Sequence, residues 1–278
     1  MLFRHGLAGL THKAAAGGTW VPSDDAGLYA TVFAHYDAEV LASVIDTTTA
    51  GLVETWEDQS AAGFDITQSG TSRPANGTNT LTDGSEVIQF DGLNDSLTSA
   101  ATGPLGSGSQ TFFAIGVAKV GTIPGTGRDV LFGYGDGSDQ YIALGLADNA
   151  GTGRVGLFFG NGNATSSTVP VAGDETIFSV SHTAADTHAD IVVRVNGETI
   201  TMTPSAGANT ISFSGTDDLR LGVRNTGGDP FTGGIREMMF FDTIPSDANR
   251  EKIEGYMAHI NGIEANLDGT HPYKSSAP

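Results

Sequence analysis

The fold is decided by one stretch near the C-terminus, Phe231–Gly262, which reads FTGGIREMMFFDTIPSDANREKIEGYMAHING. Its first part is apolar and aromatic apart from Arg236 and Glu237, and this composition predicts a buried strand from Ile235 to Phe241. Alternation along that strand is expected to place three apolar side chains on one face, those of Ile235, Met239 and Phe241.

A helix pattern follows this strand directly. Residues 242–245 break the strand, Ser246 stands where an N-cap belongs, and Asp247 lies in the first turn, where its charge complements the helix dipole. Gly262 is placed to end the helix. Four apolar residues fall at i, i+3, i+4 and i+7 and form one stripe: Ile253, Tyr256, Met257 and Ile260. We therefore predict a sheet protein closed by one short C-terminal helix.

Upstream of this stretch, about a dozen short apolar segments alternate with Gly- and Asp-rich loops. Thr111–Val120 alternates large and small residues, as a half-buried strand does. Glu86–Leu97 is interpreted as a strand, an Asp-Gly turn and a second strand, and Asn196-Gly197 is a strong two-residue hairpin signal. The pattern predicts an all-β, antiparallel two-sheet sandwich in one domain, and no βαβ units.

Composition limits the functions that remain. The 278 residues include 39 Gly and no Cys, which excludes disulfides and Cys-ligated metals. A total of 13 Lys and Arg against 32 Asp and Glu gives a net charge of −19, which disfavours nucleic-acid and anionic-membrane partners. The same charge is compatible with calcium or with a neutral glycan. No apolar run approaches the roughly 18 residues of a membrane span.

The N-terminal region is expected to form an extended arm. It shows no sustained periodicity, and its apolar residues are too interrupted for a removable signal peptide. We divide the chain into an anchoring arm (1–30), a sandwich (31–263) and a C-terminal tail (264–278). The arm offers five residues for attachment to another protein: Leu2, Phe3, Arg4, Leu7 and Leu10. A flexible leader, or an arm folded onto its own sandwich, is the alternative.

Several motifs in fixed order carry a family resemblance. They are V-x-x-F-D-G-x-x-D at Val87–Asp95, Val193–Gly197, Gly233–Glu237, and Trp56–Ser60 followed by Arg73-Pro74. Together they resemble the laminin G-like, concanavalin A-like jelly-roll domains found in phage and phage-like particle structural proteins, over roughly residues 30–262. The resemblance implies two stacked antiparallel sheets with rim loops available to ligands. It does not imply one activity.

Catalysis is not expected. A retaining glycosidase needs two carboxylates about 5 Å apart, and no acidic pair at i, i+2 on a clear strand face is present. Hydrolase, zinc-protease and phosphate-loop motifs are also missing. A glycan-cleaving enzyme is therefore the less favoured alternative.

Glycan binding is the favoured chemistry, because sugars need an aromatic platform beside planar polar groups. The sequence offers six candidate residues in two loops: Tyr134, Asp136, Asp139, Tyr141, Arg224 and Asn225. The alternative is that the tyrosines cap the edge of the sandwich.

A calcium site is a weaker hypothesis. Asp91, Asn94 and Asp95 place three oxygen-bearing side chains within five residues, which backbone carbonyls could complete as a Ca²⁺ site. The alternative is that these residues only form a turn, with their side chains bonded to the local backbone. No other cofactor is expected.

Together these features favour a non-enzymatic virion protein, such as a spike, fibre or decoration protein of a tailed phage or gene transfer agent. In this hypothesis the protein lies on the exterior of the particle. The arm would bind other virion proteins, the sandwich would bind cell-surface polysaccharide, and a homo-oligomer is compatible with this role. The alternative is a free bacterial carbohydrate-binding module.

Overall fold

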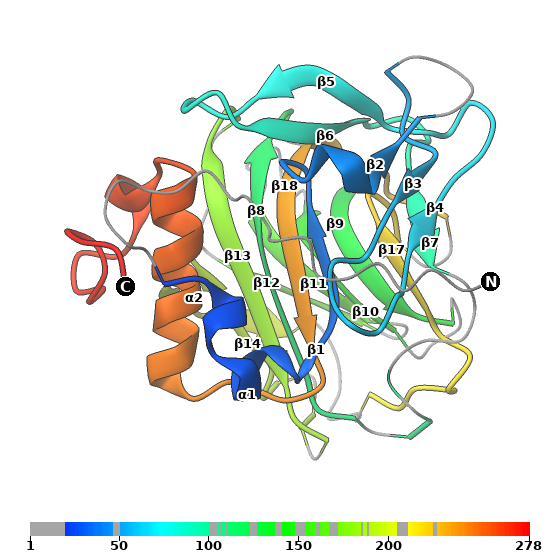
Figure 1. The fold of residues 1–278 in the computed structure, drawn as a ribbon. Coiled ribbons are helices and arrows are strands. Elements are labelled where there is room, and N and C mark those ends of the chain that lie inside the picture. The colour runs from blue at the N-terminus through cyan, green and yellow to red at the C-terminus, as the bar shows by residue number, and fades with distance from the viewer. Residues whose placement is uncertain are drawn as a thin grey trace, which may run out of the picture.

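The protein is a sandwich of two antiparallel β-sheets with one long helix against the outer side of one sheet (Figure 1). This computed structural model describes residues 20–46, 51–99, 105, 107–108, 110–122, 127–136, 141–147, 154–159, 162–166, 172–184, 186–187, 189–204, 211–224 and 227–278. The predicted all-β architecture is confirmed, and so is the C-terminal helix.

The first sheet, sheet A, has the order β15-β14-β13-β8-β18-β6-β5, and β1 also pairs with β18. Its strands are β1 (Val32–Asp37), β5 (Ala75–Thr80), β6 (Glu86–Asp91), β8 (Phe112–Val120), β13 (Glu175–His182), β14 (Val192–Val195), β15 (Glu198–Ile200) and β18 (Thr232–Phe241).

The second sheet, sheet B, has the order β16-β12-β11-β10-β9-β17-β7-β4-β3-β2. Its strands are β2 (Val44–Ile45), β3 (Thr55–Trp56), β4 (Ile66–Thr67), β7 (Leu97–Ser99), β9 (Arg128–Gly135), β10 (Tyr141–Ala147), β11 (Arg154–Phe159), β12 (Gly162–Ser166), β16 (Met202–Pro204) and β17 (Asp218–Leu221).

Helices are few in the described residues. They are α1 (Ala26–Tyr29), α2 (Asp247–Ile260) and three short 3-10 helices, η1 (Pro22–Asp24), η2 (Leu41–Ser43) and η3 (Glu264–Asn266). None of the helices that the structure describes is long and apolar enough to cross a membrane.

The main core lies between the two sheets and is rich in aromatic rings. Phe112 of sheet A stacks on Tyr134 of sheet B with ring centroids 6.0 Å apart, and Phe240 meets Phe132 edge to face at 5.3 Å. All four side chains are at most 1% exposed. Aromatic contacts of this kind add about 0.5–1.5 kcal/mol each to the area that they bury.

A second core lies on the outer side of sheet A, under α2. The predicted stripe of Ile253, Tyr256, Met257 and Ile260 is buried there against side chains of β8, β13 and β18. Ser246 caps the helix by accepting a hydrogen bond from the backbone NH of Asn249, as the sequence predicts. Burial of this stripe supplies most of the stability of the helix, because isolated helices of this length are marginal in water.

Both faces of β18 are therefore buried, but the predicted assignment of its side chains is wrong in part. Ile235 faces the inter-sheet core, whereas Met239 and Phe241 face α2. The cause is an irregularity between Ile235 and Glu237, where Arg236 is an extra residue in the pairing with β8. One extra residue reverses the alternation of every side chain that follows it.

Turn chemistry agrees with the sequence at one site and differs at another. Asn196 and Gly197 have φ values of 52° and 83°, as a two-residue hairpin turn requires, and they join β14 to β15. Glu86–Leu97 is not a hairpin, since β6 lies in sheet A and β7 in sheet B. The Asp91-Gly92 turn therefore carries the chain from one sheet to the other.

The Trp56–Ser60 stretch has a local structural role. The Asp58 carboxylate accepts hydrogen bonds from the backbone NH groups of Ser60, Phe64 and His35, at 2.8–2.9 Å. One side chain thus orders its own loop and fixes that loop to β1 of the opposite sheet.

Residues 20–30 differ from the extended arm that the sequence predicts. They form η1 and α1, and Leu28 packs in the core under α2 together with Trp20, Val21 and Tyr29. The C-terminal segment 264–278 also returns to α2, where His271 contacts Glu254 and Tyr273 lies over Gly255. The ends of the described chain therefore both pack on the α2 side of the sandwich.

Replacement of Ile253, which is fully buried, tests the helix packing. We expect Ile253→Ala to lower the free energy of unfolding by about 2–5 kcal/mol, because it leaves a cavity between α2 and sheet A. The measurement is urea-induced unfolding followed by circular dichroism. The control is Leu41→Ala, since Leu41 is 56% exposed and its truncation should change stability by less than about 0.5 kcal/mol. Equal effects of the two substitutions would contradict the packing described.

Candidate functional site

The two sheets differ in what covers their outer faces. The outer face of sheet A is covered by α2 and by residues 20–31. Neither α1 nor α2 lies on the outer face of sheet B (Figure 1). A ligand that binds a sheet face therefore has as its available surface the part of sheet B whose outward side chains stay exposed.

A row of side chains crosses this outer face in register over five neighbouring strands. Each member pairs with the next: Ile45 with Thr55, Thr55 with Thr67, Thr67 with Thr98, and Thr98 with Arg220. We call these five residues the threonine row. Its members come from β2, β3, β4, β7 and β17, between residues 45 and 220 of the chain.

Alternation along each strand explains why the row points outward. The neighbours of its members face the inter-sheet core and are buried: Val44, Trp56, Ile66, Leu97 and Leu221. Since successive side chains of a strand point to opposite faces, the anchoring of these apolar residues directs the threonines and Arg220 to solvent. Thr67 is exposed, and Thr55, Thr98 and Arg220 are half-buried.

A pocket of about 530 Å³ lies at one end of the row. It is lined by Ile45, Glu54, Thr55, Thr67, Gln68 and Ser69. The Gln68 side chain is fixed on both sides, because its Nε2 donates to Ser96 Oγ at 2.7 Å and its Oε1 accepts from the Ser69 NH at 2.9 Å. The pocket is thus lined by three hydroxyl-bearing residues, a held amide and one carboxylate beside the apolar side chain of Ile45.

At the other end of the row, Arg220 is paired within its own strand. Its Nε and Nη2 donate to Asp218 Oδ2 at 2.9 and 2.7 Å, and both side chains remain partly exposed. The pairing holds the planar guanidinium in one orientation and neutralises its charge.

Beyond Arg220 the same register continues but the chemistry changes. Arg220 pairs with Gly133, Gly133 with Ala143, and Ala143 with Phe158. Ala143 and Phe158 are fully buried, and the Arg128 guanidinium lies 4.7 Å from the centre of the Phe158 ring. The hydroxyl-bearing part of the face therefore ends at Arg220.

The six predicted glycan-binding residues are only partly brought together. Tyr141 and Arg224 do meet, since Arg224 Nη1 donates to Tyr141 Oη at 3.4 Å, and Arg224 Nε lies 3.2 Å from Asp229 Oδ2. Tyr141 is, however, only 3% exposed. Asp136 is exposed just after the end of β9. Burial raises the pKa of Asp217, and the negative charge of Asp136 raises it further. Asp139 and Asn225 lie outside the described residues.

Tyr134 is a correction to the prediction. Its ring lies in the inter-sheet core with no exposed surface, and its hydroxyl bonds to the backbone of Leu105. Burial raises the pKa of Tyr134. The alternation of Phe132 and Tyr134 along β9 directs both rings inward, so Tyr134 cannot serve as a surface platform for a sugar.

The predicted anchoring residues, Leu2, Phe3, Arg4, Leu7 and Leu10, lie outside the described residues. Attachment through them stays a prediction.

The weak calcium hypothesis falls on a turn whose oxygens already serve the backbone. Asp91 Oδ1 accepts from the NH groups of Leu93 and Asn94, and Asp95 Oδ2 accepts from the NH of Asp91. These bonds are those of the turn-forming alternative. Burial raises the pKa of Asp95 to about 6, although the hydrogen bond from Asp91 acts in the opposite direction.

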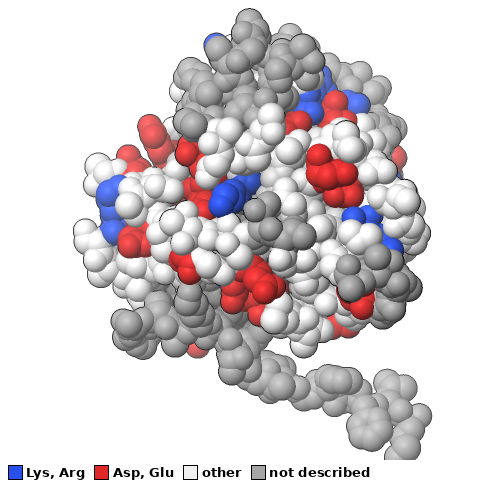
Figure 2. All heavy atoms as spheres, turned by 90° about the horizontal axis from the view of Figure 1, so that it is seen from above, with Lys and Arg blue, Asp and Glu red and all other residues white. Residues whose placement is uncertain are grey.

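Electrostatics on the surface follow the composition. Seen from the end of the sandwich where β5 and β6 lie, acidic side chains form separate groups among uncharged ones, with basic side chains beside some of them (Figure 2). The acidic side chains are thus spread over this side of the molecule (Figure 2).

No known protein family model matches this chain, and no curated protein matches its sequence. Solved structures do share its fold. A mutant α-L-arabinofuranosidase of glycoside hydrolase family 54, soaked with 4-nitrophenyl α-L-arabinofuranoside, superposes with a TM-score of 0.53 at 16% identity, over 76% of this chain and 51% of that chain. Trypanosoma rangeli sialidase in complex with 2,3-difluorosialic acid superposes with a TM-score of 0.52 at 12% identity, over 82% of this chain and 33% of the sialidase.

Domain 4 of an extracellular family 43 arabinanase from Geobacillus stearothermophilus, in complex with arabinotriose, gives a TM-score of 0.49 at 14% identity, over 79% of this chain and 96% of that chain. The chain spans about half of the arabinofuranosidase and a third of the sialidase. At these identities the arabinofuranosidase and the sialidase, both with TM-scores above 0.5, establish a β-sandwich fold that also occurs within glycoside hydrolases. The phage-specific part of the sequence resemblance finds no support among them.

The Asp95 pKa generates a test of the turn. The pKa of Asp95 is about 6 in the folded state and 3.8 ordinarily, so the folded state binds the proton more tightly than the unfolded state does. The stability that this bound proton contributes is lost as pH rises through 6. We expect Asp95→Asn, which keeps the hydrogen-bond acceptor, to raise the melting temperature at about pH 7.5 and to change it little below about pH 4.

The matched control, Asp190→Asn, should change the melting temperature in the opposite direction. Hydrogen bonds from Thr187 lower the pKa of the exposed Asp190, so its contribution is present at neutral pH and is lost as pH falls. Asp190→Asn should therefore lower the melting temperature at neutral pH only. A calcium-dependent rise in melting temperature that Asp95→Asn abolishes would contradict the turn-forming role.

Proposed function

We propose that this chain binds a neutral glycan on the outer face of sheet B and does not cleave it. The observation that carries the proposal is the threonine row with its adjoining pocket, which lies on the sheet face that α1 and α2 leave uncovered.

The chemistry of the row suits a chain of sugar units. Neighbouring strands lie about 4.8 Å apart, so the row repeats a hydroxyl at that interval across the sheet. A threonine hydroxyl both donates and accepts hydrogen bonds, as sugar hydroxyls do. Ile45 offers an apolar contact for a sugar ring face, and Arg220 offers a planar donor.

The charge distribution favours a neutral ligand over an anionic one. Arg220 is already neutralised by Asp218, and the pocket adds the carboxylate of Glu54. The chain as a whole carries −19. A sialylated or uronic-acid polymer would therefore meet like charge, and its binding would be weakened.

Binding without cleavage is supported by the carboxylates of the pocket. The residues that line it include one acidic side chain, that of Glu54, within the described part of the chain. Glycosidases need a pair of carboxyl groups that flank the scissile bond.

The solved structures that share the fold act on or bind carbohydrate, according to their names, and they support a carbohydrate-binding module better than a virion part. The proposal is therefore a free carbohydrate-binding module. Attachment to a phage-like particle stays a prediction that depends on the N-terminal arm. Residues 1–19 of this arm lie outside the described part of the chain.

The test is binding to a neutral polysaccharide, with arabinan as the first probe. Binding is measured by affinity gel electrophoresis. We expect the double substitution Thr55→Val and Thr67→Val to weaken binding about 5- to 150-fold. It removes two hydrogen-bonding hydroxyls, each worth about 0.5–1.5 kcal/mol, while it keeps the β-branched shape.

The control is Thr199→Val, an exposed threonine on the edge strand β15 of sheet A, which should bind like the unmodified chain. Polysialic acid is the anionic comparison and should bind more weakly than arabinan. If a panel of neutral polysaccharides fails to bind, the proposed function is wrong. If binding survives the double substitution, the proposed location is wrong.

A further inference from the structure

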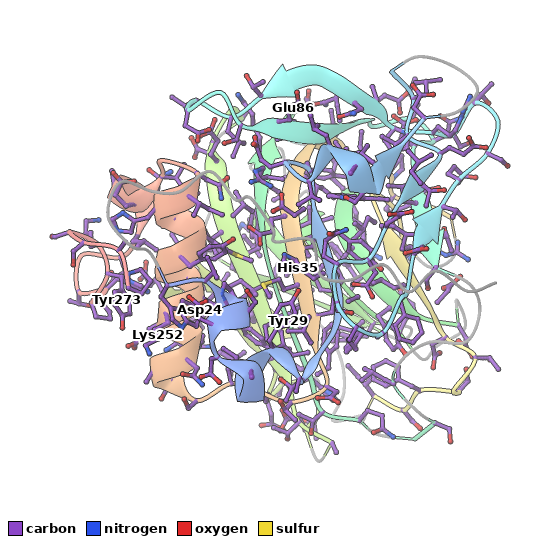
Figure 3. All side chains as sticks on the ribbon, viewed as in Figure 1. Asp24, Tyr29, His35, Glu86, Lys252 and Tyr273 are labelled. Carbon is purple, nitrogen blue, oxygen red and sulfur yellow. The ribbon has the colours of Figure 1, made fainter. Side chains whose placement is uncertain are left out.

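A group of charged side chains is buried on the opposite side of the molecule, between sheet A and residues 20–31. His35 and Asp37 lie on β1, and Arg236 and Glu237 lie at the bulge of β18. All four are at most 3% exposed. Tyr29 of α1 lies beside His35 (Figure 3), with the two rings edge to face and their centroids 6.0 Å apart.

The strand pairing brings the three potential metal ligands together. Asp37 pairs with Glu237 across β1 and β18, and His35 lies two residues before Asp37 on the same face. His35 Nε2 is 2.9 Å from Glu237 Oε1, and one ligand atom from each of the three residues lies within 4.8 Å of the others. Ligand atoms around one tetrahedral zinc ion are about 3.4 Å apart, given bond lengths near 2.1 Å, so small side-chain rotations suffice.

The charges of the cluster do not balance on their own. Asp37 and Glu237 carry two negative charges, and Arg236, which is ion-paired with Asp37, carries one positive charge. An uncompensated buried charge costs several kcal/mol. The cluster therefore needs one more cation, which is either a proton on His35 or a metal ion.

One atom distinguishes these two possibilities. Glu237 Oε2 is buried and has no hydrogen-bond partner among the described residues. A proton on His35 Nε2 satisfies only Oε1 of that carboxylate. A metal ion between the three residues would be coordinated by one oxygen of the carboxylate, and the metal-bound water would donate to the other.

We propose that His35, Asp37 and Glu237 bind a divalent metal ion of the zinc type. One imidazole nitrogen and two carboxylate oxygens are ligands that zinc accepts, with water as the fourth ligand. Calcium is a poorer fit, because it takes six to eight oxygen ligands.

The surrounding groups match those of a metal site. His35 Nδ1 is 3.0 Å from the Tyr29 hydroxyl, which in turn donates to the Gln59 carbonyl at 3.3 Å. With the tyrosine proton donated to Gln59, Nδ1 carries the imidazole proton in the proposed site, and Nε2 is left to coordinate a metal. Arg236 holds the Asp37 carboxylate in the same way.

The metal would have a structural role. Its ligands come from β1 and β18, and Tyr29 connects them to α1, so the ion would join the two strands beneath residues 20–31. Because the ligands are buried, we expect uptake during folding.

The experiment is refolding of the full chain from denaturant with either zinc chloride or EDTA, followed by dialysis and metal analysis. We expect one zinc ion per chain after refolding with zinc and a higher melting temperature than after refolding with EDTA. Cobalt in place of zinc should give the visible absorption bands of a four-coordinate site, a readout that needs no substitution.

Glu237→Gln keeps the size of the side chain and should abolish zinc retention, whereas His182→Gln should not. His182 is a fully buried histidine on β13 outside the cluster, so its variant controls for the loss of a buried imidazole. If the unmodified chain retains no more zinc, manganese or cobalt than Glu237→Gln does, the proposal is wrong and the cluster holds a proton only.

Discussion

The burial of both faces of β18 is the constraint on which the rest of the structure depends. One face packs Ile235, Met238 and Phe240 between the sheets, and the other packs Met239 and Phe241 under α2. A strand buried on both faces needs a cover on its outer side, and α2 with residues 20–31 provides it. Because α2 and these residues lie on sheet A, the outer face of sheet B remains for a ligand.

The same strand explains where buried charge occurs. The extra residue at Arg236 reverses the alternation and turns Glu237 toward the covered side of sheet A, where His35 and Asp37 of β1 meet it. Buried charges of this kind are tolerated only when they are paired or bound to a cation. The sandwich thus has two chemically distinct surfaces: a solvated hydroxyl-bearing face on sheet B and an enclosed charged layer on sheet A.

Local signals in the sequence predicted local structure well. Ser246 and the apolar stripe predicted α2, and Asn196-Gly197 predicted the hairpin, because caps, periodicity and positive φ values act over a few residues. Ile235 does not share a face with Met239 and Phe241 as predicted, because a bulge depends on the partner strand and is not visible in the sequence. Tyr134 was expected at the surface, although its alternation with Phe132 is the available sign that it points inward.

The threonine row could not have been predicted from the sequence. In the sequence, Thr67 and Thr98 are each typical of an ordinary strand residue that points to solvent. That they are neighbours follows only from the register between β4 and β7, which the sequence does not give. The same is true of His35 and Glu237, which lie 202 positions apart. Composition argues against anionic partners wherever the site lies, because the surface is acidic, and the neutral glycan stays a prediction.

Ligand binding on the outer face of sheet B is tested most directly by nuclear magnetic resonance of the labelled chain during titration with neutral arabino-oligosaccharides. We expect the shifted amide and methyl signals to belong to Thr55, Thr67, Thr98 and their neighbours on sheet B, while those of α2 stay unchanged. Shifts that map to α2, or to the exposed end of β9 at Asp136 without the threonine row, would contradict the assignment of sheet B as the ligand-binding face.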